Sequence, residues 1–309
     1  MSMENCRTAY GEALVELGGE DERIVVLEAD LGKSTMSYLF QEKFPHRYFE
    51  MGISEQNMTS FAAGLATAGK VAFTNSFAVF SAGRSYDQIR QGICTANLNV
   101  KINGSSSGLS DFGDGATHQA VEDIAIMRAI PRMTVLVPMD GAETRKIVKA
   151  AAKHDGPVYI RISRNPVENF YPEDREYIIG QPYVVREGTD IVVFACGIMV
   201  SKAMLAAQEL QKEGISVRVV NVSSLKPIDE EAIKKLAKGV KGIITAEEHS
   251  VIGGLTSVIT YILRGSGCPV EAVAIMDSFG QSAQSHDELL KHYGLTEKEI
   301  IAFAKKILN

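Results

Sequence analysis

Strand-like apolar runs alternate with amphipathic stretches along almost the whole chain. This alternation is typical of a parallel β-sheet with helices packed on it, because parallel strands need long crossover connections. In the first part of the chain the expected strands cover 24–30, 70–76, 99–105, 133–139 and 157–163. The expected helices lie between them, over 5–18, 55–68, 82–97, 118–129 and 141–154. The pattern therefore indicates an α/β fold.

From Pro166 to Gly188 the alternation stops, and two further prolines and several acidic residues follow without a helical period. We expect a linker over 167–188 with an edge strand at its end. A second alternating segment follows, with strands expected at 190–196, 216–222, 242–248 and 270–276 and helices at 201–213, 229–238, 253–264, 286–292 and 296–308. The chain is thus expected to form two domains, 1–166 and 189–309, each a mainly parallel sheet flanked by helices.

Composition narrows the class of function. The 309 residues include 38 acidic and 32 basic side chains, a net charge of −6, which argues against broad nucleic-acid binding. No run approaches the roughly 20 apolar residues of a membrane span, and the first residues lack an apolar export signal. The cysteines are widely separated and form no CxxC pair, so free thiols in a reducing cytoplasm are expected.

Three segments carry side chains that can do chemistry. In GISEQNM (52–58) Glu55 opens an expected helix, where an acidic residue usually does no more than complement the helix dipole. Phe77 and Phe80 lie three apart at a strand-to-helix transition; such pairs are usually core but can form one side of a slot. A long Gly/Ser/Asp loop leads to His118, and loops of this length are often functional.

Taken together, the order and spacing of GISEQNM, FAVFSAGRSYDQIR and DGATHQ resemble the transketolase family. The resemblance runs from Arg7 to the end of the chain. It implies that residues 1–166 form a pyrimidine-binding domain and residues 189–309 a transketolase C-terminal-like domain. It further implies thiamine diphosphate as the cofactor. The implied reaction is the transfer of a two-carbon ketol unit between sugar phosphates, as in the carbohydrate metabolism of pentose phosphates.

The resemblance assigns Glu55 the catalytic and cofactor-binding carboxylate. Hydrogen-bonded to the cofactor's pyrimidine ring, it would favour the imino tautomer, so that the cofactor's own amino group can act as a base. Phe77 and Phe80 would stack on the pyrimidine. Glu55 replacements should then reduce the rate far more than the stability.

The same resemblance assigns residues to the sugar. His118, also counted as catalytic, and Asp114 would contact the sugar hydroxyls, and Arg164, Arg7 and Ser34 would bind its phosphate. Paired arginines suit a phosphate geometrically. The chain departs from the family at Ser106, where many relatives place a phosphate-contacting histidine. It departs again at Gly83, where they often have a third aromatic residue for which Tyr86 could compensate.

Half of the cofactor site is missing from the sequence. The family's Mg²⁺ and diphosphate site reads GDG with an Asn about 25–30 residues later. Here the triplet Gly113-Asp114-Gly115 is followed by Asn165 as the next asparagine, too distant, so no metal ligand is expected in this chain. The resemblance therefore predicts a separate N-terminal, diphosphate-binding subunit that supplies the Mg²⁺ ligands. The expected assembly is an α2β2 heterotetramer that also self-associates through the pyrimidine domain.

Other functions remain open from the sequence. The beta subunit of a 2-oxo acid dehydrogenase has a similar layout and would decarboxylate its substrate. A deoxyxylulose-phosphate synthase-like enzyme half is a further alternative, because YDQIR and EEHSVIGG also resemble that branch. A non-catalytic, regulatory paralogue is the alternative from another class, but it would be expected to lose Glu55 or the DGATHQ loop.

Overall fold

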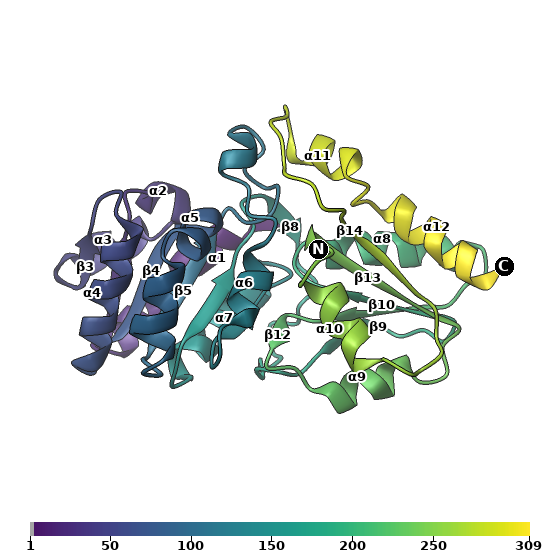
Figure 1. Cartoon of the computed structure of the whole chain (residues 1–309), viewed down its shortest axis with the longest axis horizontal. Helices are drawn as coiled ribbons and strands as arrows, with labels where there is room; N and C mark the ends of the chain where they lie inside the picture. The colour runs from purple at the N-terminus through teal and green to yellow at the C-terminus, as the bar shows by residue number, and fades with distance from the viewer. Residues whose placement is uncertain (1–2) are drawn as a thin grey trace.

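The computed structural model describes residues 3–309, which form two α/β units side by side (Figure 1). The first unit surrounds a seven-stranded sheet in the order β12-β6-β7-β5-β4-β2-β3. Its strands are β2 (Ile24–Glu28), β3 (Tyr48–Glu50), β4 (Val71–Phe77), β5 (Val100–Ser105), β6 (Thr134–Leu136), β7 (Val158–Arg161) and β12 (Ser224–Lys226). Every neighbouring pair is parallel except β12 with β6.

Helices cover this sheet. They are α1 (Cys6–Glu20), α2 (Gly32–Thr35), α3 (Tyr38–Lys43), α4 (Glu55–Thr67), α5 (Ala78–Gly83), α6 (Asp123–Ala129) and α7 (Gly141–Lys153), with 3-10 turns at Pro45–Arg47 and Gly115–Thr117. The single helix predicted over 82–97 is wrong: α5 ends at Gly83 and a separate π-helix spans Gln88–Cys94. The helix predicted from 118 starts later, because Ala120 pairs with Gly108 as an isolated antiparallel bridge.

The second unit has a five-stranded sheet in the order β14-β13-β10-β11-β9. Its strands are β9 (Tyr183–Arg186), β10 (Ile191–Ala195), β11 (Val217–Asn221), β13 (Gly242–Ser250) and β14 (Val270–Ile275). Its helices are α8 (Met199–Lys212), α9 (Glu230–Ala237), α10 (Leu255–Ile262), α11 (His286–His292) and α12 (Glu297–Leu308). Only β9 runs antiparallel, at the edge where the sequence predicted an edge strand. The mainly parallel α/β fold of both units is therefore confirmed.

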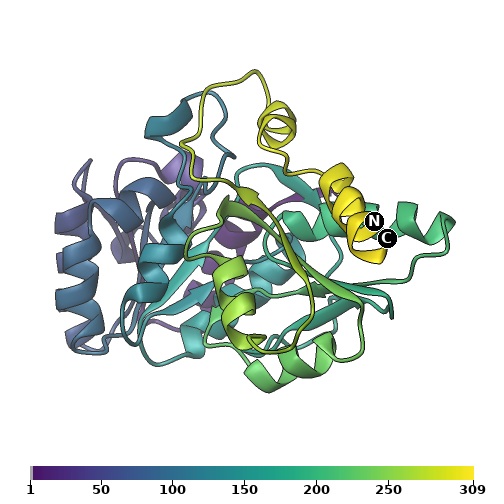
Figure 2. The ribbon, with the colours of Figure 1, turned by 45° about the vertical axis from the view of Figure 1, so that its right-hand side comes forward.

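The two units are joined by more than the connecting segment. Strand β12 comes from the second part of the sequence but pairs with β6 of the first sheet. Strands β1 (Met3–Asn5) and β8 (Pro166–Glu168) form a separate antiparallel pair. The loop after β14 also reaches back over the first unit (Figure 2), and the Ala283 amide donates to the Phe112 carbonyl at 2.9 Å. The loop that ends at His118 is thus fixed from both units.

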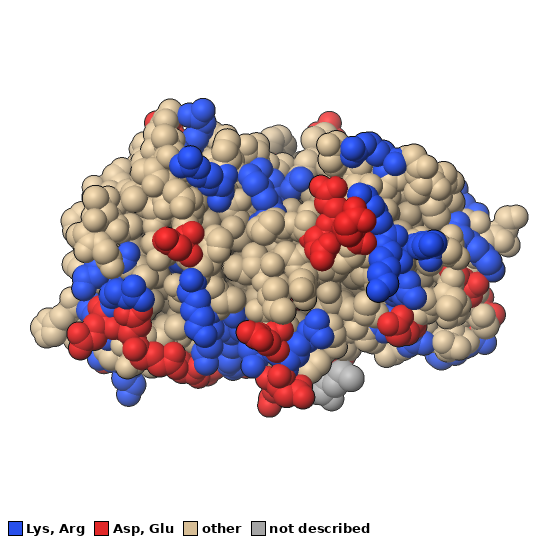
Figure 3. All heavy atoms as spheres, turned by 90° about the horizontal axis from the view of Figure 1, so that it is seen from below, with Lys and Arg blue, Asp and Glu red and all other residues tan. Residues whose placement is uncertain are grey.

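The surface carries charges of both signs. On the face shown in Figure 3, Lys and Arg side chains are interspersed with Asp and Glu, so this face offers no continuous basic surface. Within residues 3–309 no helix has both the length and the apolar character that crossing a bilayer requires. Cys6, Cys94, Cys196 and Cys268 are all free thiols.

Candidate active site

The predicted site residues meet at the carboxyl edge of the first sheet. In open parallel sheets this edge is the usual ligand-binding side, because the connecting loops there converge. The residues come from the segments that follow successive strands: Ser34 after β2, Glu55 after β3, Phe77 at the end of β4, Asp114 and His118 after β5, and Arg164 after β7. Arg7 joins them from the start of α1.

Glu55 is a buried carboxylate beside two aromatic rings. It is the first residue of α4, and its side chain is only 3% exposed. Phe77 ends β4 and Phe80 lies in the first turn of α5; their rings are nearly parallel, with centroids 6.1 Å apart. A flat face of aromatic carbon next to a carboxylate suits a planar heterocycle that can also hydrogen-bond.

Arg84 was not predicted, and it links these groups. Its Nη1 lies 2.8 Å from Glu55 Oε1, while its guanidinium carbon sits 4.2 Å from the Phe80 ring centroid. The Arg84 side chain is 51% exposed. The spacing of four residues from Phe80 to Arg84 places both on one side of a helical turn, so this spacing could have revealed the contact.

His118 faces the same rings. Its imidazole is edge-on to Phe77 at 6.3 Å and to Phe80 at 5.2 Å between centroids. Thr117 Oγ1 lies 2.9 Å from His118 Nδ1, so this hydroxyl helps to orient the imidazole. Asp114 is exposed at the start of the 3-10 turn that leads to His118. The structure therefore brings Glu55, Phe77, Phe80 and His118 together, with Asp114 at the rim.

A second group of residues forms a basic corner of the site. Arg7 Nη1 donates to the Ser34 carbonyl at 2.7 Å, which joins two of the predicted anion-binding residues. Burial, and then the like charge of Arg164, lowers the pKa of the Arg7 guanidinium. Asp111, which was not predicted, lies 2.9 Å from Arg164 Nη1 through its Oδ2. No signal in the sequence separates Asp111 from the other acidic residues of its loop.

The structure shows the environments of Ser106 and Gly83, the two positions at which the chain departs from the family pattern. Ser106 is buried in a left-handed conformation with φ 50°, and its hydroxyl has no hydrogen-bond partner among residues 3–309. Gly83 is exposed, and Tyr86 packs against the buried core of the first unit. In the part of the chain that the structure describes, His118 is the ring that contacts both Phe77 and Phe80, and Tyr86 forms no ring pair with either.

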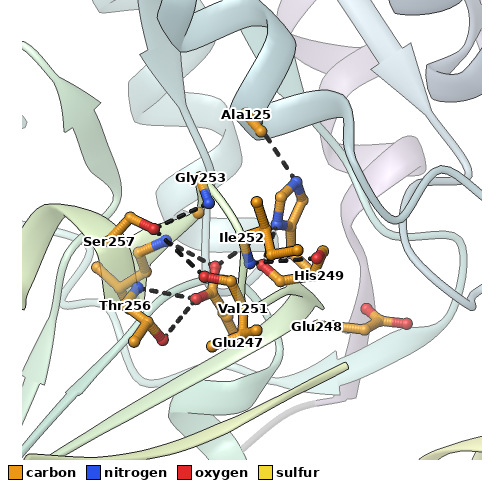
Figure 4. A network of polar contacts seen from close by, with 12 residues as sticks. Ala125, Glu247, Glu248, His249, Val251, Ile252, Gly253, Thr256 and Ser257 are labelled. Atoms are coloured by element: carbon orange, nitrogen blue, oxygen red, sulfur yellow. Dashed lines mark hydrogen bonds and ion pairs between the residues drawn. The ribbon is translucent and has the colours of Figure 1, made fainter. Parts of the chain in front are cut away.

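The EEHSVIGG segment links the two units (Figure 4). Glu247 accepts hydrogen bonds from the backbone amides of Leu255 and Thr256 and so caps α10. Glu248 Oε1 accepts from the Leu109 amide at 2.8 Å and lies 2.7 Å from His286 Nε2. His249 Nδ1 lies 2.7 Å from the Ser250 carbonyl, which makes it the donor nitrogen. The second unit thereby holds the loop that carries Asp111, Asp114 and His118.

A buried ion pair supports the same junction. Arg161 Nε lies 2.9 Å from Asp123 Oδ2, with side chains 4% and 1% exposed. Arg161 Nη2 also donates to the carbonyl oxygens of Ala120 and Glu248. Arg161 is therefore structural.

Residues 3–309 contain no cluster of three or more His, Cys, Asp or Glu side chains that could hold a metal ion.

Two family models match nearly the whole chain. The transketolase pyrimidine binding domain matches residues 3–168, and the transketolase C-terminal domain matches residues 180–300. The putative transketolase C-terminal section of Methanocaldococcus jannaschii is 42% identical over 98% of this chain and 95% of its own length. The 6-deoxy-6-sulfo-D-fructose transketolase subunit SqwH of a Clostridium species is also 42% identical, over 97% of this chain and 94% of its own.

A solved structure has the same fold. It is a split gene transketolase described as an inactive beta4 tetramer, 46% identical to this chain with a TM-score of 0.89. The similarity covers 99% of both chains. This chain therefore shares its fold with that split-gene transketolase chain over nearly the full length of both.

Proposed function

The chain belongs to the transketolase family, and we propose that it is the pyrimidine-binding subunit of a split transketolase. The observation that carries this proposal is the buried Glu55 carboxylate at the carboxyl edge of the first sheet, which Arg84 connects to the Phe80 ring stacked on Phe77. Two-carbon ketol transfer is the reaction, and sugars that end in an anionic group, such as sugar phosphates, are the substrates.

Thiamine diphosphate fits the residues that are present. Among residues 3–309 the Glu55 carboxylate has one side-chain partner, the half-exposed Arg84, which can give way to a ligand. The carboxylate and the two phenyl rings match an aminopyrimidine, which has a flat face and a ring nitrogen able to share a proton. When bound, this cofactor supplies the nucleophilic carbon that accepts the two-carbon unit.

The site residues of this chain then have distinct roles. Glu55 would share a proton with the pyrimidine nitrogen, and its side chain is only 3% exposed, so the site excludes most water. Phe77 and Phe80 position the ring by stacking. His118 and Asp114 bind sugar hydroxyls, and His118 is the group able to accept or return a hydroxyl proton.

The remaining parts of the site come from another protein. We propose a diphosphate-binding subunit that carries the Mg²⁺ ligands and joins this chain in a cytoplasmic α2β2 complex, with the pyrimidine domains paired at the two-fold axis. Residues 1–166 would form the pyrimidine domain and residues 189–309 the C-terminal domain. The asparagine spacing in the sequence, which does not match the family's metal site, supports a partner that provides these ligands.

The reaction class is tested with an uncharged acceptor, so that the result does not depend on how the site binds a terminal anionic group. A mixture of both subunits with thiamine diphosphate and Mg²⁺ is given hydroxypyruvate as donor and glycolaldehyde as acceptor. Formation of the four-carbon ketose supports ketol transfer. Decarboxylation of pyruvate coupled to reductive acetylation of an added lipoyl group would instead favour a 2-oxo acid dehydrogenase. Decarboxylative condensation of pyruvate with glyceraldehyde 3-phosphate would favour a deoxyxylulose-phosphate synthase-like enzyme.

A further inference from the structure

A buried carboxylate lies among the arginines of the basic corner. The Asp111 side chain is 4% exposed, whereas its partner Arg164 is 34% exposed. Asp111 therefore belongs to the wall of the site and is not a mobile surface group. It is held there because the Ser110 hydroxyl donates to the Ser107 carbonyl and the Asn165 side-chain Nδ2 donates to the Ser110 carbonyl.

Both arginines are also held at fixed positions. Asn5 Nδ2 donates to the Arg164 carbonyl at 2.8 Å, and Asn5 Oδ1 accepts from the Arg7 amide at 2.9 Å. The Ser110 hydroxyl accepts from the Arg164 amide at 3.2 Å. One side chain thus joins the two backbone positions, and the Arg7 and Arg164 charges act on each other.

One N–H group of Arg7 is available as a hydrogen-bond donor. Its Nε is buried and has no hydrogen-bond partner among residues 3–309. A buried guanidinium N–H without a partner is costly, and a bound anion would satisfy it. The corner is therefore built to accept an anion, while Asp111 already compensates one of its two positive charges.

We infer that Asp111 is a specificity-determining residue, which adapts this corner to a singly charged terminal oxyanion, such as a sulfonate or a carboxylate, in preference to a phosphate dianion. This inference rests on the proposed function for the identity of the substrate. The Arg7 and Arg164 guanidinium groups and the Asp111 carboxylate together sum to +1, which a single negative charge balances. The charge of Asp114 also acts at Asp111, and it opposes a second negative charge on the ligand. The second charge of a phosphate would lie beside a buried carboxylate, where like charges repel strongly.

Acceptor kinetics test this in the reconstituted enzyme. Aldoses of one length that end in a sulfonate, a carboxylate or a phosphate are compared by kcat/KM, each relative to glycolaldehyde. The wild-type chain should favour each singly charged acceptor over the phosphate by about tenfold or more, a modest difference for a like-charge contact. Asp111→Asn should raise the phosphate-to-sulfonate ratio by about tenfold or more on the same argument.

Asp174→Asn, at an exposed position, is the matched control and should leave the ratio unchanged. A wild-type preference for phosphate, or the same ratio in Asp111→Asn as in the wild type, would overturn the inference. A complete lack of turnover with glycolaldehyde would instead count against the proposed function.

A binding measurement decides the charge inference without turnover. The full chain is treated with phenylglyoxal, and modification of Arg7 and Arg164 is followed by peptide mass spectrometry with inorganic phosphate or methanesulfonate as protectant. Asp111→Asn should lower the phosphate concentration for half-protection by about tenfold or more, and should affect methanesulfonate less. Equal phosphate protection in both proteins would contradict the role of Asp111.

Discussion

Arg84 occupies the position on Glu55 that the cofactor would need. Its guanidinium is bonded to Glu55 Oε1 at 2.8 Å and lies over the Phe80 ring at 4.2 Å. Both the carboxylate and the aromatic face are the groups assigned to the pyrimidine. Arg84 therefore compensates a buried charge, and under the proposed assignment cofactor binding would have to displace it.

Removal of Arg84 should strengthen cofactor binding. Because Arg84 is 51% exposed, solvent screens the ion pair, and we expect Arg84→Met to lower half-saturation by thiamine diphosphate only about two- to fivefold. The measurement is a cofactor titration of turnover in the two-subunit mixture. Arg90→Met, also exposed, is the control that should change nothing. Weaker cofactor binding in Arg84→Met would show that Arg84 assists the cofactor.

The second unit should influence substrate binding through His286. Its Nε2 contacts Glu248 Oε1, which also accepts from the Leu109 amide, at the start of the loop that carries Asp111, Asp114 and His118. His286→Ala removes one hydrogen-bond partner from the buried Glu248 carboxylate. We therefore expect KM for the acceptor to rise about fivefold or more, while the cofactor concentration for half-saturation stays within about twofold. His292→Ala, at an exposed position of the same helix, should match the wild type. Equal increases for acceptor and cofactor would indicate a general loss of structure.

Sequence patterns predicted the fold, and the resemblance to the transketolase family supplied most residues of the candidate site. Apolar periodicity is a local property, and it located the strands β2, β4, β5 and β10 within a few residues. The structure places Glu55, Phe77 and His118 at one edge of the sheet, because each lies at or after the carboxyl end of a different parallel strand.

Contacts between distant segments were not predictable. The helix expected from 118 fails because Ala120 pairs with Gly108, and the pairing of β12 with β6 joins residues about ninety positions apart in the sequence. Asp111 and Glu248 act through partners on other elements, Arg164 and His286. Neither partnership leaves a periodic signal in the sequence.

The Arg161–Asp123 ion pair should be important for stability. Arg161→Met removes the cation from a carboxylate that is 1% exposed, so we expect a loss of about 3–5 kcal/mol in the free energy of unfolding. Denaturant unfolding followed by circular dichroism measures it. Arg23→Met breaks an exposed pair with Asp21 and should leave the free energy of unfolding nearly unchanged, because solvent screens that pair. Similar losses in both variants would contradict the assigned importance of burial.

Glu143 should make stability dependent on pH. Its Oε2 accepts from the Met139 amide and its Oε1 from Asn221, and burial raises the pKa of Glu143 from 4.5 to about 7. The folded chain then binds this proton more tightly than the unfolded chain. Its contribution is therefore fully present below pH 4.5 and is lost as pH rises toward 7.

Glu143→Gln should remove that slope. Integrated over this range, the shift corresponds to roughly 3 kcal/mol of stability. The measurement is the free energy of unfolding at intervals between pH 4.5 and 7.5 for both proteins, taken as their difference at each pH. The difference should increase with pH in favour of the variant. A constant difference across the range would show that Glu143 titrates normally.

The most direct test of the whole account is reconstitution with a single changed atom at Glu55. Ketol transfer is measured for this chain alone, for a candidate diphosphate-binding subunit alone, for their mixture and for the mixture with Glu55→Gln. We expect turnover only in the wild-type mixture, and a loss of about 10²–10⁴-fold in the variant with its thermal midpoint nearly unchanged. Glu42→Gln, exposed on α3, should retain full rate. Turnover by this chain alone, or full turnover with Glu55→Gln, would contradict the account.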